Sequence, residues 1–183
     1  NAIKIRPEYA EAYNNIGNTF IELGILNKAI KNYKFALKID DGYSEAHNNL
    51  GLSLMSLGDL ETAILCFEKA IKLNPNYSAA FHNLSALKKF EKNDFQIVQM
   101  KILLSDNKIN NNDKIYLCFA LAKVYEDLED NEKLFYYLNK GNKLRKKQLN
   151  YSISSDRKKH LLIKNLFKTR PLPLKINKDS KPN

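Results

Sequence analysis

The sequence predicts an all-α protein built from stacked antiparallel helix hairpins, an α-solenoid, with a basic helical extension at its C-terminal end. Three observations predict this fold. Related segments recur along the 183-residue chain at a fixed offset of 34 residues. Small residues recur within each copy, where two helices must cross closely. From Lys140 onward, 14 of the 30 Lys and Arg residues are found but only two of the 20 Asp and Glu residues.

Two copies of the repeat align without a gap. Residues 12–40, AYNNIGNTFIELGILNKAIKNYKFALKID, match residues 46–74, AHNNLGLSLMSLGDLETAILCFEKAIKLN, and a third copy starts with AFHNLSALKKFEKND at Ala80. The first helix of each copy keeps a small residue at the same place: Gly17, Gly51 and Ser85. The period and the pattern are those of the tetratricopeptide repeat (TPR), so the chain resembles TPR proteins. The resemblance implies two helices per unit and a superhelix with a concave inner face.

The second helix of each unit has its own repeated pattern. Alanine or an aromatic residue recurs at matching places: Ala29 and Ala63, Ala36 and Ala70, Tyr33 and Phe67. The alanines leave room for the neighbouring helix, and the aromatics fill the gaps between helices. Gly24 and Gly58 lie between the two helices of a unit, where a residue with positive φ ends a helix.

The start of the chain indicates a fragment, because residues 2–7, AIKIRP, align with residues 70–75, AIKLNP. We therefore expect further units upstream. The predicted organisation is the end of a truncated repeat (1–9), repeats at 10–43 and 44–77, a degenerate repeat with its connector (78–114), a TPR-like hairpin (115–150), an amphipathic basic helix (151–168) and a Pro-containing linker (169–183).

Two helices outside the regular repeats are predicted from their apolar spacing. Residues 94–105 should form one, with Phe95, Val98, Ile102 and Leu103 on or near one face. Residues 152–167 should form the other, capped by Ser154 or Ser155 and carrying an apolar stripe of Leu162, Ile163, Leu166 and Phe167.

Residues 117–151, LCFALAKVYEDLEDNEKLFYYLNKGNKLRKKQLNY, resemble the last TPR-like unit of bacterial TPR-containing sulfotransferases, and the resemblance continues to Phe167. It implies that the chain is the substrate- or partner-recruiting N-terminal region of a sulfotransferase that uses the sulfate donor PAPS. The family's Pro-Arg-Ser-Gly-Thr-Thr donor loop does not occur in the sequence. No catalytic or cofactor-binding residue is therefore assigned, and PAPS is expected only for a missing downstream domain. The alternative is a stand-alone TPR adaptor that assembles protein complexes.

A row of polar residues on the first helix of each unit is the candidate binding site for a protein or peptide. Its members are Asn14, Asn15, Asn18, Asn48, Asn49, His82 and Asn83. Asn15, Asn49 and Asn83 recur at the repeat period, and an asparagine amide both donates and accepts, so it can pair with a peptide bond. The row is similar to the asparagine ladder in the TPR superhelix of O-GlcNAc transferase. The alternative is that asparagine is merely common at these positions of the repeat.

The basic residues after the repeats allow three interpretations. This basic patch comprises Lys143, Arg145, Lys146, Lys147, Arg157, Lys158 and Lys159. It could be a solvated helix face, a contact for a further domain or that domain's anionic ligands, or a surface for nucleic acid or an anionic membrane. The sequence argues against the third, because few aromatic residues interleave with the charges and no nucleic-acid-binding motif accompanies them.

The remaining reactive residues predict neither a metal site nor catalysis. Cys66 and Cys118 lie in apolar helical stretches and are expected to be buried reduced thiols, which suits a cytoplasmic location. His47, His82 and His160 are isolated in sequence, and Cys–His metal spacing is absent. No stretch of about 20 apolar residues, the length that spans a bilayer, is present.

Overall fold

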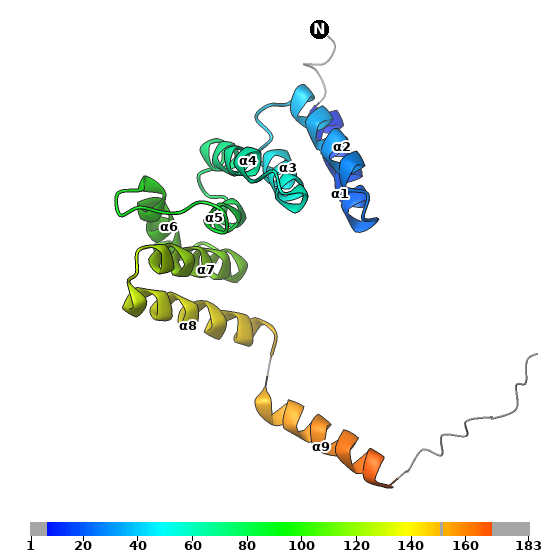
Figure 1. Cartoon of the computed structure of the whole chain (residues 1–183), viewed down its shortest axis with the longest axis vertical. Coiled ribbons are helices and arrows are strands. Elements are labelled where there is room, and N and C mark those ends of the chain that lie inside the picture. Colours follow the sequence, from blue (N-terminus) through cyan, green and yellow to red (C-terminus); the bar gives the residue numbers. More distant parts are fainter. Residues whose placement is uncertain (1–6, 151, 170–183) are drawn as a thin grey trace, which may run out of the picture. The chain divides into compact units, whose positions relative to one another are not determined.

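The computed structural model describes residues 7–150 and 152–169, and in these residues it contains nine α-helices and no strand (Figure 1). The predicted all-α solenoid is confirmed for this part of the chain. The first helix already begins at Pro7, before the predicted repeat at 10–43. Most of the predicted truncated upstream repeat (residues 1–6) and of the predicted linker (residues 170–183) lies outside the described residues.

The first two hairpins are regular. Helices α1 (Pro7–Glu22) and α2 (Leu26–Ile39) form the first, and α3 (Ser44–Leu57) and α4 (Leu60–Leu73) form the second. The turns between them pass through Gly24 and Gly58, whose φ angles are 72° and 84°. Glycine adopts this left-handed conformation without a steric penalty, so both helices end where the sequence predicts.

Glycine in the first helix of each hairpin lets an aromatic ring of the second helix pack directly on the backbone. A Cβ atom at Gly17 would lie 2.5 Å from the ring of Tyr33, and one at Gly51 would lie 2.6 Å from the ring of Phe67. Both rings are almost completely buried. The repeated glycine and the repeated aromatic residue are therefore the two halves of one contact within each hairpin.

The third unit departs from the repeat. Helix α5 (Ser78–Ser85) has only 8 residues, and it packs mainly against α7 (Asn111–Asp127), while it barely touches α6 (Phe95–Ser105). The loop between α5 and α6 is held by Phe90, whose side chain is 2% exposed and whose backbone N–H donates to Asp127 Oδ2 at 3.2 Å. The hydrogen bond fastens this connection to the end of α7, and the buried ring joins it to the hydrophobic core.

The apolar face of α6 is not the one that the spacing predicts. Phe95, Val98 and Ile102 are 56–63% exposed, and only Leu103 of the predicted set packs on the core. The buried side of the helix consists instead of Gln96, Ile97 and Met100. The prediction was wrong because α6 has apolar residues all round, so the helix that it packs against, α7, decides which side is covered.

Helix α7 pairs with α8 (Asn131–Gln148) through close contacts. Asn110 caps α7 by accepting from the Asp113 N–H at 2.9 Å. A Cβ at Gly141 of α8 would lie 3.1–3.2 Å from Phe119 and Cys118 of α7. The rings of Tyr125 and Tyr137 stack with centroids 5.6 Å apart. The hairpin of α7 and α8 is thus joined by a few close side-chain contacts, and Gly141 is the residue of α8 that is buried.

Helix α9 (Ile153–Thr169) belongs to a second compact unit, which starts at Lys146. It begins at Ile153, so Ser154 and Ser155 lie inside the helix and the prediction that one of them caps it was wrong. The backbone N–H of Asp156 donates to the Ser152 carbonyl at 3.2 Å instead. The stripe of Leu162, Ile163, Leu166 and Phe167 is exposed.

Candidate functional site

Three asparagines of the predicted row meet between the first helices of consecutive repeats. Asn49 of α3 donates one amide hydrogen to Asn14 Oδ1 at 3.0 Å and the other to Asn18 Oδ1 at 3.2 Å. Both acceptors lie on α1. Since an asparagine side chain has two N–H donors, the donors of Asn49 are fully used inside the protein.

The next pair of repeats is joined in the same way. Asn83 of α5 donates to Asn48 Oδ1 of α3 at 2.8 Å. Asn48 and Asn14 occupy the same repeat position, as do Asn83 and Asn49. The side chains of Asn14 and Asn48 are 0% and 4% exposed, so each needs a hydrogen-bond partner. The asparagine row therefore first serves to bind one repeat to the next.

The amide nitrogen of Asn14 makes weaker contacts on its other side. It lies 3.4 Å from the Tyr43 hydroxyl and 3.3 Å from Glu45 Oε1. Burial, and next the carboxylate of Glu45, raise the pKa of Tyr43 above its usual value of 10.0. Tyr43 is thus a neutral hydroxyl at physiological pH, and its oxygen can accept from Asn14.

The other two members of the predicted site are placed differently. Asn15 is exposed. His82 is half-buried, with its ring edge-on to Tyr116 and Phe119 of α7 at centroid distances of 5.4 and 6.4 Å. Its Nδ1 atom is buried without a hydrogen-bond partner in the described part of the chain. His82 therefore packs against α7 and Asn15 faces solvent, whereas the other five asparagines of the row bond to one another.

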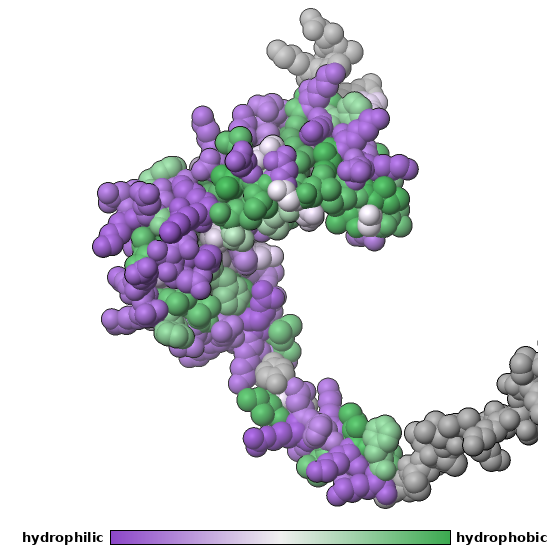
Figure 2. Space-filling view, viewed as in Figure 1, coloured by the Kyte–Doolittle hydropathy of each residue, from purple (hydrophilic) through white to green (hydrophobic). Residues whose placement is uncertain are grey.

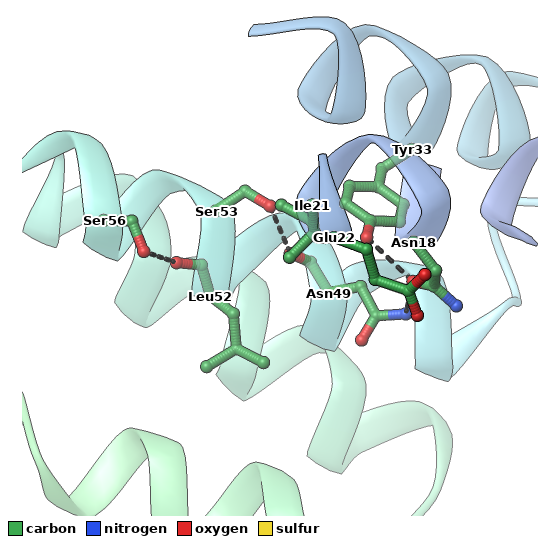
Figure 3. Close-up of a pocket in the computed structure, with 8 residues that line it drawn as sticks. All are labelled: Asn18, Ile21, Glu22, Tyr33, Asn49, Leu52, Ser53 and Ser56. Carbon is green, nitrogen blue, oxygen red and sulfur yellow. Dashed lines mark hydrogen bonds between the residues drawn. The ribbon is translucent and has the colours of Figure 1, made fainter. Parts of the chain in front are cut away.

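A pocket of about 380 Å³ opens beside Asn18 and Asn49 (Figure 3). Its walls come from α1, α2 and α3: Asn18, Ile21, Glu22, Tyr33, Asn49, Leu52, Ser53 and Ser56. The Tyr33 hydroxyl donates to Asn18 Oδ1 at 2.8 Å, and burial raises the pKa of Tyr33 to about 12. Figure 2 shows hydrophobic surface over α3 and over the turn from α1 into α2.

Sequence reasoning missed the pocket residues beyond Asn18 and Asn49. A signal for them existed, because Glu22 and Ser56 are separated by one repeat period and occupy the same place in consecutive units. Tyr33 was predicted only as a packing residue, and its hydroxyl in addition faces the pocket. Lining residues could therefore have been found by extending the periodic comparison to the last turn of each first helix.

The basic patch lies on two helices. Lys143, Arg145, Lys146 and Lys147 occupy the last turns of α8, and Arg157, Lys158 and Lys159 the first turns of α9; all seven are exposed. The guanidinium of Arg145 lies 5.9 Å from the centre of the Phe119 ring. Exposure of these side chains agrees with each of the three interpretations, so all three stay predictions.

Both cysteines and His47 have structural surroundings in the described part of the chain. Burial raises the pKa values of the Cys66 and Cys118 thiols, so both are protonated and poorly nucleophilic. His47 Nε2 lies 3.0 Å from the Asp41 carbonyl and so contributes to the turn before α3. Across residues 7–150 and 152–169, no group of three or more His, Cys, Asp or Glu residues could hold a metal ion.

Two further observations concern ligands and membranes. The pocket beside Asn49 has the Glu22 carboxylate in its wall, and the expectation that PAPS serves only a missing downstream domain stays a prediction. Among the helices that the structure describes, none combines the length and the apolar character needed to cross a bilayer.

Comparisons with known proteins identify the repeats. A family model described as "Tetratricopeptide repeat" matches residues 44–77, and one described as "TPR repeat" matches residues 17–58. The first match covers the second predicted repeat. No curated protein sequence matches the chain. Neither family model describes a sulfotransferase, so the resemblance of residues 117–167 to that family stays a prediction.

Solved structures share the fold. BtubC from P. vanneervenii is 18% identical, with a TM-score of 0.60 over 80% of this chain and 67% of that one. A structure of MamA is 22% identical, with a TM-score of 0.57 over 82% and 86% of the two chains. MamA from residue 41 to its end, from Desulfovibrio magneticus RS-1, is 23% identical, with a TM-score of 0.55 over 74% and 75%. Identities this low support a shared architecture and carry no information on ligands.

Proposed function

From a chain that carries tetratricopeptide repeats in an all-α solenoid, we propose a scaffold that binds an extended segment of a protein partner. The binding surface is the A-helix face, which we define as the side of α1, α3 and α5 that carries the asparagine row. Stacked hairpins expose one face of these first helices along the whole array, so an extended segment could contact several repeats in succession.

The observation that carries the proposal is the hydrogen-bonding capacity that remains along the row. Asn49 uses both of its donors, but its Oδ1 accepts no hydrogen bond from the described residues and points away from α1 in Figure 3. Asn83 uses one donor and keeps one N–H and its oxygen. Asn15 is exposed. These groups match the alternating N–H and C=O groups of an extended backbone.

The bonds inside the row also refine the proposed mode of binding. Bidentate pairing with a peptide bond needs a donor and an acceptor on one amide, and Asn49 offers only the acceptor. We therefore assign Asn49 to a backbone N–H of the partner, and Asn83 to a complete peptide bond. The asparagines that link the repeats are at the same time held in place for the partner, which reduces the entropy lost on binding.

Selection of peptides from a random displayed library against the full chain tests the proposal. A selected peptide should bind the wild-type chain and lose at least about tenfold in affinity when alternate backbone amides are N-methylated, because each lost backbone bond weakens the complex. The same peptide should bind more weakly to Asn15→Ala and as well as before to Asn27→Ala, a change at an exposed asparagine of α2. Equal affinity for the N-methylated and unmodified peptides would contradict backbone recognition.

We further propose, as a finer and separate hypothesis, that this scaffold recruits a substrate or partner for a PAPS-dependent sulfotransferase domain. It is supported by the sequence resemblance of residues 117–167 and by helices α7, α8 and α9 following one another in the order that this resemblance implies. The coding sequence after Asn183 tests it. A hydrophobic strand followed by a Pro-Arg-Ser-Gly loop favours the enzyme, and a stop codon or another helical hairpin favours the stand-alone adaptor.

A further inference from the structure

The pocket between α1, α2 and α3 has already used most of its hydrogen-bond donors. Tyr33 donates to Asn18 Oδ1, and Asn49 donates to Asn14 and Asn18. The hydroxyl of Ser53 donates to the Asn49 carbonyl at 2.9 Å, and that of Ser56 to the Leu52 carbonyl at 3.0 Å (Figure 3). Among the lining side chains, only the amide nitrogen of Asn18 keeps donor hydrogens that no acceptor in the described residues takes up.

The groups that remain open in this pocket are acceptors. They are the Glu22 carboxylate, Asn49 Oδ1 and the lone pairs of the Ser53 and Ser56 hydroxyl oxygens. No ion pair joins Glu22 to a cation anywhere in the described residues. A ligand for this pocket must therefore bring donors of its own, and a positive charge would complement Glu22.

The helices that carry the asparagine row are negatively charged, as is Glu22 in the pocket. Helices α1, α3 and α5 contain four glutamates, among them Glu11, Glu22 and Glu45, and no Lys or Arg, although the whole chain has a formal net charge of +10. Helix α2 carries four lysines and no acidic residue. The A-helix face is thus negative in a protein that is otherwise strongly basic, and it favours cationic ligands over anionic ones.

The apolar part of the pocket also suits a long basic side chain. Ile21 and Leu52 line it beside the acceptors, and the methylene stem of a long basic side chain can lie along such residues while its charged end reaches the oxygens. A guanidinium presents five N–H donors in a planar fork, so it can satisfy several acceptors at once, whereas an ammonium offers three.

We propose that this pocket is an anchor site for an arginine side chain of the bound segment, with Glu22 as its charge partner and Asn49 Oδ1 and the serine oxygens as further acceptors. The proposal rests on the peptide-binding function inferred above. It adds which side chain of the bound segment would fix the position of that segment along the A-helix face. A segment that carries arginine at one position should then be bound in a single register along the A-helix face.

Titration of the ¹⁵N-labelled full chain with Nα-acetyl-L-arginine N-methylamide, followed by amide chemical shifts at low salt, tests the proposal. Saturable shifts are expected in the C-terminal half of α1 and in α3, around Asn18, Asn49 and Ser53. The citrulline analogue, which is neutral and of nearly the same shape, should bind at least about threefold more weakly, the size expected for an exposed charge pair.

Two matched variants assign the effect to the pocket. Glu22→Gln should weaken binding of the arginine analogue about threefold, because it removes the charge and keeps the shape. Glu61→Gln removes one charge from the exposed first turn of α4, outside the pocket, and should leave the affinity unchanged. Absent or non-saturable shifts, or equal binding of the arginine and citrulline analogues, would overturn the proposal.

This titration is independent of the peptide selection. Selected peptides that bind the A-helix face without any preference for arginine would leave the proposed function standing and overturn the anchor site. Saturable binding of the arginine analogue in the pocket, without any peptide binding to the asparagine row, would contradict the proposed function and retain the pocket as a cation site.

Discussion

The amide nitrogen of Asn49 lies 3.0 Å from the amide oxygen of Asn14, and this bond joins the first helices of two consecutive repeats. The bond between Asn83 and Asn48, at 2.8 Å, does the same one repeat later. Polar bonds between buried or half-buried side chains are directional, so they fix how one hairpin is rotated against the next. The asparagine row therefore sets the geometry of the surface on which we place the partner.

Removing Asn14 should destabilise the chain more than removing its neighbour. The Asn14→Ala variant removes a fully buried amide and leaves one N–H of the half-buried Asn49 without its acceptor, and we expect the free energy of unfolding to fall by about 1–3 kcal/mol. Asn15→Ala alters an exposed side chain and should change it by less than about 0.5 kcal/mol. Urea denaturation followed by circular dichroism measures both, and equal losses would contradict a structural role for Asn14.

Adding volume at the contact between Gly51 and Phe67 should destabilise the chain about as much as removing Asn14. The Gly51→Ala variant places a Cβ 2.6 Å from the Phe67 ring, so one of the two helices must move, at a cost of about 1–3 kcal/mol. A smaller partner should relieve the clash, so the double variant with Phe67→Leu should be more stable than the sum of the two single changes allows. If the losses of unfolding free energy are additive in a double-mutant cycle, the Cβ at residue 51 and the ring of Phe67 do not clash, and this account of the contact is contradicted.

Two phenylalanines in the third unit should differ widely in how much stability is lost when each is replaced by alanine. Phe90 is 2% exposed in a loop, and Phe95 is 63% exposed on α6. Phe90→Ala should cost about 3–5 kcal/mol because it leaves a cavity, whereas Phe95→Ala should cost less than about 1 kcal/mol. Chemical denaturation of the two variants distinguishes this structure from a regular repeat with Phe95 in the core, in which the order of the losses would be reversed.

The loop before α6 should give stability that depends on pH. A backbone bond from the Glu91 N–H, and next the bond from Lys88, lower the pKa of Asp94 below its usual value of 3.8. Because the pKa is lower in the folded state, this contribution is complete well above pH 4 and disappears as the pH falls through the folded-state value. Asp94→Asn should therefore cost up to about 1 kcal/mol at pH 7, as for a partly exposed pair, and progressively less as the pH falls through the folded-state pKa of Asp94. Urea midpoints of both proteins across this range give the test, and a difference that does not depend on pH would contradict it.

The regular part of the fold could be predicted from the sequence because its determinants recur at one period. Gly17 with Tyr33 and Gly51 with Phe67 repeat a single contact, and a repeated contact is visible without coordinates. The third unit could not be predicted in this way. Its geometry depends on Phe90 and Asp127, which lie far apart in the sequence and have no counterpart in the other units.

The candidate site was predictable only in part, for a related reason. The period locates the asparagines on one face, but whether an amide faces a partner or another amide depends on how far apart α1 and α3 lie. The structure shows that the nitrogen of Asn49 is used within the chain and that its oxygen is not. The pocket likewise needs Tyr33 from a second helix, which no comparison of first helices would reveal.

The account's central claim is that the A-helix face binds an extended partner segment. The most direct measurement is an amide chemical-shift map of the ¹⁵N-labelled chain with a library-selected peptide bound. The account predicts shifts that follow α1, α3 and α5 in succession, including Asn15, Asn49 and Asn83. Shifts confined to α2, α4 and α6, with the asparagine side-chain amides unchanged, would contradict it.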